Sequence, residues 1–161
     1  MRLAATVLAV LLLSASAACA QPETQSPTTF MAQNALAEGV HTLPTGEQYK
    51  ILHAGPGTSR HPTPKDYVTV EYEGALLNGQ IFDSSYQRGK PARFELDGLV
   101  QGWIDALQQM RPGDEWIVYI PPSLGYGAEQ KGPIPANSVL VFRLELLAVG
   151  GPPAATGSGA G

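Results

Sequence analysis

The amino-acid sequence predicts an α+β domain in which an antiparallel β-sheet wraps across a single helix. Short segments that alternate apolar and polar residues, as strands do, recur along most of the chain and are separated by turn residues. One segment within this region, residues 100–110, instead places its apolar residues at helical spacing. The length of 161 residues suits one domain with tails, and the hydrophobic share of 43% is enough for one core.

The first twenty residues have the order of a secretory signal peptide, not that of a folded element. A basic start is followed by the apolar run 3–13 and by the small residues 14–20. Cleavage before Gln21 would release a soluble chain, whereas the residues around Cys19 also resemble a lipobox, in which that cysteine is lipidated. We therefore expect export, to the periplasm, with membrane attachment only if Cys19 is lipidated.

A linker with a short helix precedes the predicted domain, and a small-residue tail follows it. Residues 21–38 begin polar, and their second part, Phe30–Glu38, is rich in helix formers and stops before Gly39. This helix is about two turns long, too short for a stable coiled coil, so we expect a monomer. The domain is predicted to span residues 39–149, and residues 150–161 are predicted to be disordered because they have nothing to bury.

Strand patterns and turn signals define the sheet. In the segment 67–73, Val68, Val70 and Tyr72 fall on one face of a strand, and polar residues fall on the other. Asn78-Gly79 is a strong signal for a hairpin turn after this strand. By the same reasoning strands are predicted over residues 47–52, 67–73, 81–82, 92–96, 115–120 and 139–147.

The predicted helix over residues 100–110 has one apolar stripe. The stripe consists of Val100, Trp103, Ile104, Leu107 and Met110. Arg111-Pro112-Gly113 ends the helix, because proline and glycine both interrupt helical structure. Such a stripe is most often plain core, so the helix is expected to be the element that the sheet covers.

Composition argues against several classes of function. The net charge of −4 disfavours nucleic acid, which attracts basic surfaces. His41, His53 and His61 lie in extended or loop sequence without the spacing of metal ligands, so neither a metal nor a cofactor is expected. Cys19 is the only cysteine, so no internal disulfide can form and stability must come from the core.

Ordered motifs over about a hundred residues carry a resemblance to a known family. They are Val70–Gly74 with Leu77–Gly79 and Phe82–Ser85, then Gln101–Trp103 with Leu107, Gln109 and Met110, then Ile120-Pro121 with Leu124–Gly127, and finally Ile134–Ser138 with Leu140–Phe142 and Glu145–Leu147. Together they resemble the FKBP-type peptidyl-prolyl cis-trans isomerases. The preceding segment Gly46–Leu52 is similar to the lead-in of exported bacterial members, including the macrophage-infectivity-potentiator-like group.

The resemblance implies a bent antiparallel sheet around a short helix, and rotation about Xaa-Pro bonds in an aromatic pocket between the two. The expected role is to assist the folding of exported proline-containing proteins, and a macrolide inhibitor is a further expected ligand. Matching the motifs assigns catalytic roles to Asp83, Tyr126, Phe82 and Trp103, and substrate binding to Tyr72, Phe94, Leu99, Val100, Ile134 and Phe142.

The chemistry of the reaction explains why such a pocket would be aromatic and dry. The planar amide is held by resonance, which places negative charge on its oxygen, and the twisted transition state loses this charge separation. An apolar site therefore favours the twisted form. The hydroxyl of Tyr126 and the main-chain N–H of Val100 would donate hydrogen bonds to substrate carbonyls.

Three alternatives remain open from the sequence. Asp83 precedes Ser84-Ser85 and could serve only as a turn or cap residue, and Tyr126 between two glycines could be a surface ring. The same groove could also belong to a non-catalytic holdase that binds unfolded chains. One departure from the family pattern is Ala92, which stands two positions before Phe94 where an aromatic residue is frequent, and which is expected to thin one wall of the pocket.

Overall fold

The structure is a computed structural model that describes residues 25–151 of the chain. The predicted signal peptide over residues 1–20, the alternative lipidation of Cys19 and nearly all of the predicted tail lie outside the described residues. None of the helices between residues 25 and 151 is long and apolar enough to cross a membrane.

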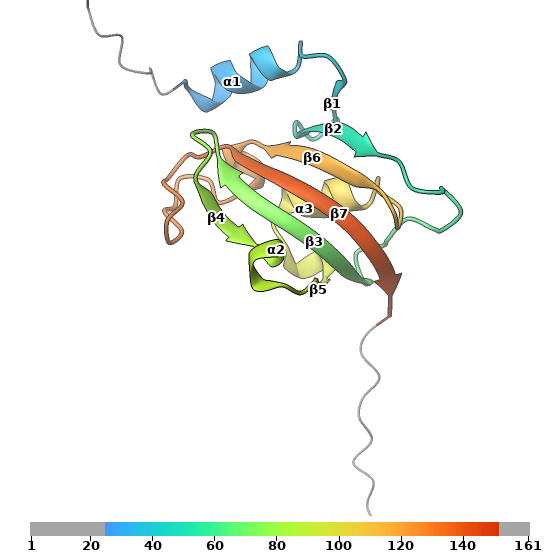
Figure 1. Cartoon of the computed structure of the whole chain (residues 1–161). Helices are drawn as coiled ribbons and strands as arrows, with labels where there is room; N and C mark the ends of the chain where they lie inside the picture. The colour runs from blue at the N-terminus through green and yellow to red at the C-terminus, as the bar shows by residue number, and fades with distance from the viewer. Residues whose placement is uncertain (1–24, 152–161) are drawn as a thin grey trace, which may run out of the picture.

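Seven antiparallel strands form one curved sheet that packs against helix α3 (Figure 1). The strand order is β1-β2-β6-β7-β3-β4, and β5 pairs with β3 beside β4. The predicted α+β fold class is confirmed. In chain order the elements are α1 (Pro27–Asn34), β1 (Val40–Thr42), β2 (Gln48–His53), β3 (Tyr67–Leu76), β4 (Ile81–Ser84), α2 (Ser85–Arg88), β5 (Ala92–Glu95), α3 (Gln101–Leu107), β6 (Glu115–Ile120) and β7 (Leu140–Gly150).

The long strands β3 and β7 form the centre of the sheet. Every second residue of β3 is buried, starting at Val68, so the apolar face predicted from the sequence is the one that faces α3. Strand β7 alternates in the same way and continues to Gly150, which pairs with Tyr67. The sequence predicts that this strand ends at residue 147, because residues 148–150 show no apolar alternation. Their backbone nevertheless continues the pairing of β7 with β3.

Helix α3 is shorter than the predicted segment 100–110. Val100 is its N-cap residue, and after Leu107 the chain tightens into turns, in which the N–H of Met110 donates to the carbonyl of Leu107. The stripe still packs as predicted, with Trp103 and Leu107 buried against the sheet. A Cβ at Gly102 would lie 2.6 Å from Ile120, so the glycine allows α3 to approach β6 closely.

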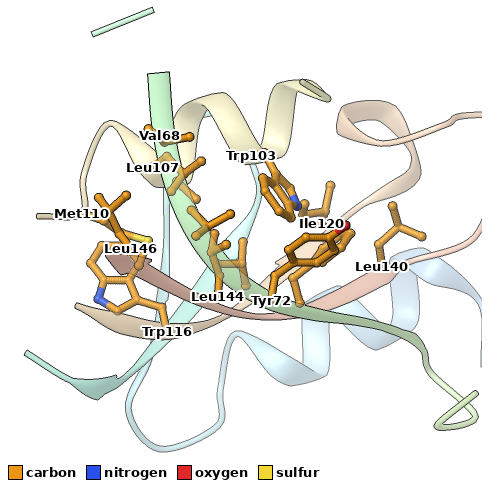
Figure 2. Packing of buried hydrophobic residues seen from close by; sticks show 14 of the residues in the cluster. Val68, Tyr72, Trp103, Leu107, Met110, Trp116, Ile120, Leu140, Leu144 and Leu146 are labelled. Carbon is orange, nitrogen blue, oxygen red and sulfur yellow. The ribbon is translucent and has the colours of Figure 1, made fainter. Parts of the chain in front are cut away.

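One hydrophobic core fills the space between α3 and the concave face of the sheet (Figure 2). Trp116, Met110 and Leu146 gather at one end of this core, and Trp103 and Tyr72 lie at the other. Val68, Leu107 and Leu144 lie between these two groups, and Ile120 and Leu140 continue the core on the side of Trp103 and Tyr72.

Helix α1 lies near β2 and β6 (Figure 1). Its Phe30 ring lies 6.0 Å from that of Tyr119, which alternates with the buried residues of β6 and so points away from α3. Helix α1 begins at Pro27, within the segment predicted to be a linker, because Ser26 caps its N-terminus by accepting from the N–H of Thr29 at 3.2 Å. Gln48 of β2 holds the helix from below, because its amide donates to the carbonyl of Met31 at 2.7 Å and accepts from Asn34 at 2.9 Å.

Candidate functional site

A cavity of about 460 Å³ opens at the N-terminal end of α3. Its walls come from β3, β4, β5, β7, the residues before α3 and the loop between β6 and β7. All ten residues that the sequence motifs assign to the site line this cavity, together with Gly98 and Pro133: they are Tyr72, Phe82, Asp83, Phe94, Leu99, Val100, Trp103, Tyr126, Ile134 and Phe142.

Trp103 forms the floor, and three aromatic rings meet it edge to face. Its centroid lies 5.1 Å from that of Tyr72, 6.0 Å from Phe94 and 5.1 Å from Phe142, with interplanar angles of 82°, 82° and 88°. Edge-to-face pairs are a favoured geometry for aromatic rings, so these contacts hold the indole in one orientation. Trp103 is only 5% exposed, and it therefore serves the core and the cavity floor at once.

A β-bulge explains how two consecutive residues of β4 reach the same cavity. Gly74 of β3 pairs with Asp83, whereas the next residue, Ala75, pairs with Ile81, so Phe82 is the extra residue of the pair of strands. In a regular strand Phe82 and Asp83 would point to opposite faces. The bulge redirects them, and both line the cavity. The ring of Phe82 then lies 5.6 Å from that of Phe142, at 86°.

A polar network closes one side of the cavity. The hydroxyl of Tyr72 donates to Asp83 Oδ2 at 2.5 Å. Arg88 of α2 donates to the other oxygen of Asp83 and, at 2.8 Å, to the hydroxyl of Tyr72. Its guanidinium also lies over the Tyr72 ring, 5.3 Å from the centroid. Asp83 is therefore part of the cavity wall, while the cap of α2 is Ser84, which accepts from the N–H of Gln87.

This network sets the ionisation of its members. Burial would raise the pKa of Asp83, but the hydrogen bonds from Tyr72 and Arg88 and the charge of Arg88 outweigh it, so the pKa lies below the ordinary value. Burial and the bond to Asp83 raise the pKa of Tyr72, against the opposing effect of Arg88. Asp83 is thus an ionised acceptor and Tyr72 a neutral donor at neutral pH.

Arg88 is a member of the site that the sequence motifs do not identify, because residues 86–90 read only as a short loop. The segment forms one helical turn, capped by Ser84 and ended by Gly89 with a φ of 70°. That turn brings Arg88 back over the cavity wall. A serine followed five residues later by glycine is a recognisable signal for such a turn, and it could have identified Arg88 as a neighbour of Asp83.

Three donors on residues that line the cavity have no partner among residues 25–151: the hydroxyl of Tyr126, the main-chain N–H of Val100 and the buried indole N–H of Trp103. Val100 is the N-cap residue of α3 and lies two residues after the 3₁₀ turn Leu96–Gly98. Tyr126 lies in a loop held by the N–H of Gly127, which donates to Pro122 at 2.8 Å. Backbone structure therefore fixes the N–H of Val100 and brings Tyr126 to the cavity, where both can donate to a ligand.

Ala92 does not reach the cavity. The residue pairs with Val70 across β5 and β3 and packs against the core, and it is not among the residues that line the cavity. Phe94, two residues further along the same face of β5, supplies the wall on this side. The expected weakening of ligand binding by the small side chain of Ala92 stays a prediction.

Comparison with known proteins identifies relatives of this chain. A family model described as "FKBP-type peptidyl-prolyl cis-trans isomerase" matches residues 58–147. "Peptidyl-prolyl cis-trans isomerase Mip" of Coxiella burnetii is 49% identical over 121 residues, which are 74% of this chain and 52% of that protein. "Outer membrane protein MIP" of Legionella longbeachae is 43% identical over 121 residues, 74% of this chain and 51% of that protein.

Solved structures give the same result. The crystal structure of FkpA from Escherichia coli superimposes with a TM-score of 0.74 at 39% identity, covering 79% of this chain and 59% of that one. The chain spans about half the length of the curated relatives that it matches.

Proposed function

Because the chain belongs to the FKBP-type peptidyl-prolyl cis-trans isomerase family, we propose that it catalyses rotation about Xaa-Pro peptide bonds in the cavity above Trp103. The single observation that carries the proposal is the composition of this cavity. Edge-to-face aromatic rings surround an open, largely apolar space, and two residues that line it, Tyr126 and Val100, carry donors without partners among the described residues.

The apolar walls supply the main catalytic effect. Rotation must overcome a barrier of about 20 kcal/mol, most of it from amide resonance. Resonance separates charge in the planar ground state, and water stabilises that charge. A planar prolyl amide bound on Trp103, beside Phe82 and Phe142, loses this stabilisation. The twisted transition state, which has less charge separation, loses less. The difference lowers the barrier without breaking any bond.

The two donors add directional stabilisation. The main-chain N–H of Val100 would hold the carbonyl on one side of the prolyl ring, so that the ring stays in place while the acyl side turns. The hydroxyl of Tyr126 would donate to a carbonyl in the twisted geometry. Both bonds are stronger in a dry cavity than in water, and neither donor has to be reorganised during the reaction.

The charged network at the wall is proposed to position rings, not to transfer protons. Both oxygens of Asp83 are engaged by Tyr72 and Arg88, and a carboxylate with a lowered pKa is a weak base. Its role is to fix Tyr72 against Trp103 and to offer a polar edge to the substrate backbone.

The cellular role follows from the family and the predicted signal peptide. We propose that the chain assists the folding of exported proline-containing polypeptides, from a mature form that begins at Gln21 or at a lipidated Cys19, and that it acts as a monomer. The name "outer membrane protein" carried by the Legionella longbeachae relative supports a location outside the cytoplasm. Proline-containing segments are the expected substrates, and a macrolide inhibitor is the expected competitor.

A protease-coupled assay with a tetrapeptide that contains an Xaa-Pro bond tests the proposal. The mature chain should accelerate cis-trans relaxation without metal or nucleotide, and a variant at an exposed position away from the cavity, Leu36→Ala, should behave identically. Unchanged relaxation, together with suppressed aggregation of an unfolded protein, would replace the enzyme with the alternative function, a holdase that binds chains in the same groove.

A further inference from the structure

Gly74 occupies a position where glycine is normally unfavourable. It lies in the middle of β3, on the face buried against α3. Glycine in a strand interior adds no side-chain packing and loses more backbone entropy on folding than any other residue. A glycine is required where φ is positive, but Gly74 is not among the positive-φ glycines of residues 25–151. The reason for a glycine here must therefore be space.

The aromatic rings of Phe82 and Phe142, which line the cavity, occupy that space. A Cβ at Gly74 would lie 2.6 Å from Cε1 of Phe142 and 2.7 Å from Cε2 and Cζ of Phe82. Real Cβ atoms essentially never come so close to another heavy atom. The edges of both rings thus rest on the bare backbone of Gly74, and the bulge in β4 directly opposite brings Phe82 over it.

The other crowded glycines do not touch the cavity. Among the described glycines, only Gly55 and Gly102 share with Gly74 a Cβ position closer than 3.0 Å to a neighbour. Gly102 faces Ile120, and Gly55 faces the backbone of Gly113 at 2.7 Å. Neither Ile120 nor Gly113 lines the cavity.

We propose that Gly74 is a positioning residue that sets the width of the prolyl pocket, by leaving open the space in which the rings of Phe82 and Phe142 rest. The inference rests on the proposed function, because the width of the cavity matters only if a substrate enters it. Gly74 itself does not line the cavity, so it acts through these two rings.

A methyl group at this position has a predictable effect. Behind the rings lies β3 itself, and Trp103 and Tyr72 flank Phe142 at centroid distances of 5.1 and 6.4 Å. Both rings line the cavity, so each has open space on that side. The added methyl of Gly74→Ala should push them into it, since an overpacked side chain moves toward the least resistance. The pocket should become narrower, and turnover of a substrate with a larger ring in place of proline should be reduced more than turnover of the proline substrate.

The experiment compares tetrapeptides that carry proline or its larger six-membered homologue pipecolic acid at the isomerising bond, with leucine before it in both, using the wild type, Gly74→Ala and the matched control Gly55→Ala. Gly74→Ala should lower kcat/KM about tenfold for the pipecolic acid peptide and clearly less for the proline peptide. Gly55→Ala crowds a remote turn to the same extent, so it should lower the unfolding midpoint but leave the ratio between the two peptides at its wild-type value.

A second pair of variants covers the case in which Gly74→Ala folds poorly. In the Phe82→Leu or Phe142→Leu background one crowding ring is gone, so Gly74→Ala should destabilise the protein less than it does in the wild type. Purely additive losses of stability would overturn the inference. So would a substrate ratio that Gly74→Ala leaves unchanged in an active enzyme. An inactive wild type would overturn the proposed function, and this inference with it.

Discussion

The two tryptophans of the core are buried to the same extent and have different surroundings. Trp103 and Trp116 are each 5% exposed. Trp116 lies face to face with Tyr49, with centroids 4.2 Å apart and an angle of 13°, and His41 stacks on the outer side of Tyr49 at 5.2 Å. Trp103 is met by the edges of its neighbours. The stacked rings of Trp116 and Tyr49 leave no space between them. The rings around Trp103 contact it by their edges, and a cavity remains between them.

Aromatic content alone therefore does not make a site. Both ends of the core carry an indole, and in both the ring nitrogen is buried without a hydrogen-bond partner among the described residues. What differs is the geometry of the neighbours. At one end the bulge in β4 places Phe82 over Gly74 of β3, whereas at the other end Tyr49 of β2 stacks on Trp116, beside a register shift in the pairing of β2 with β6.

Removing either indole should produce the largest effect, on stability. Trp103→Ala and Trp116→Ala should each lower the free energy of unfolding by about 3–5 kcal/mol, because each leaves a large hole in the core. Urea denaturation followed by circular dichroism measures this loss.

The milder variants Trp103→Phe and Trp116→Phe, which should remain folded, sharpen the comparison. Only the change at Trp103 should lower kcat/KM per folded molecule. An equal loss of activity in Trp116→Phe would show that the stacked end of the core contributes to the site, and would contradict the division of the core into a packed end and a catalytic end.

Opening a wall of the cavity should have the next largest effect, on catalysis. Phe82→Ala removes a half-buried ring and admits water above Trp103, so kcat/KM should fall by more than about tenfold while the unfolding midpoint changes little. The protease-coupled assay and a urea titration of the same preparation check both statements. A loss of activity that merely tracks a loss of folded protein would contradict the proposed role of this wall.

Removing one donor should have a smaller effect. Tyr126→Phe keeps the ring and deletes the hydroxyl, so it should lower kcat/KM by at most about tenfold, near the value of one net hydrogen bond of about 1–1.5 kcal/mol. If Tyr126→Phe proved more damaging than Phe82→Ala, directed hydrogen bonding would be the main source of catalysis and the apolar walls would be secondary.

The residues around Trp103 show which parts of the site can be predicted from the sequence and which cannot. The alternation in β3 and the stripe in α3 predict which faces meet, and the motifs predict which residues surround Trp103. The bulge at Phe82 and the helical turn that carries Arg88 are not predictable from hydrophobic periodicity, because both depend on backbone geometry that breaks the period. The crowding at Gly74 is hidden for a similar reason, since it depends on where two rings from other strands come to rest.

The ionisation of Glu47, a buried residue close to Asp105 of α3, is expected to have a small effect on stability. Glu47 is fully buried, accepts from Thr45 at 2.6 Å with one oxygen, and has no partner within the described residues for the other. Burial raises the pKa of Glu47, and the charge of Asp105 adds to this effect. A raised pKa means that the contribution of Glu47 to stability is complete below the ordinary carboxyl range and is lost as pH rises through the folded-state value.

Glu47→Gln should therefore stabilise the protein at about pH 7.5 and give no advantage near about pH 4. The difference between variant and wild type must be followed at each pH, because Asp66 has the opposite dependence. Hydrogen bonds from Arg60 and Thr63 lower the pKa of Asp66, so its contribution is lost as pH falls. An advantage of Glu47→Gln that is the same at every pH would show that Glu47 does not change its ionisation over this range.

The most direct test of the central claim, that a dry aromatic cavity catalyses the rotation without proton transfer, is the pH dependence of kcat/KM in the wild type. Asp83 has a lowered pKa and Tyr72 a raised one, so neither changes its charge near neutrality. Catalysis by the dry cavity predicts a rate that is nearly constant from about pH 6 to 8. A bell-shaped profile within that range would contradict the claim, because it would require a titrating acid or base in the catalytic step.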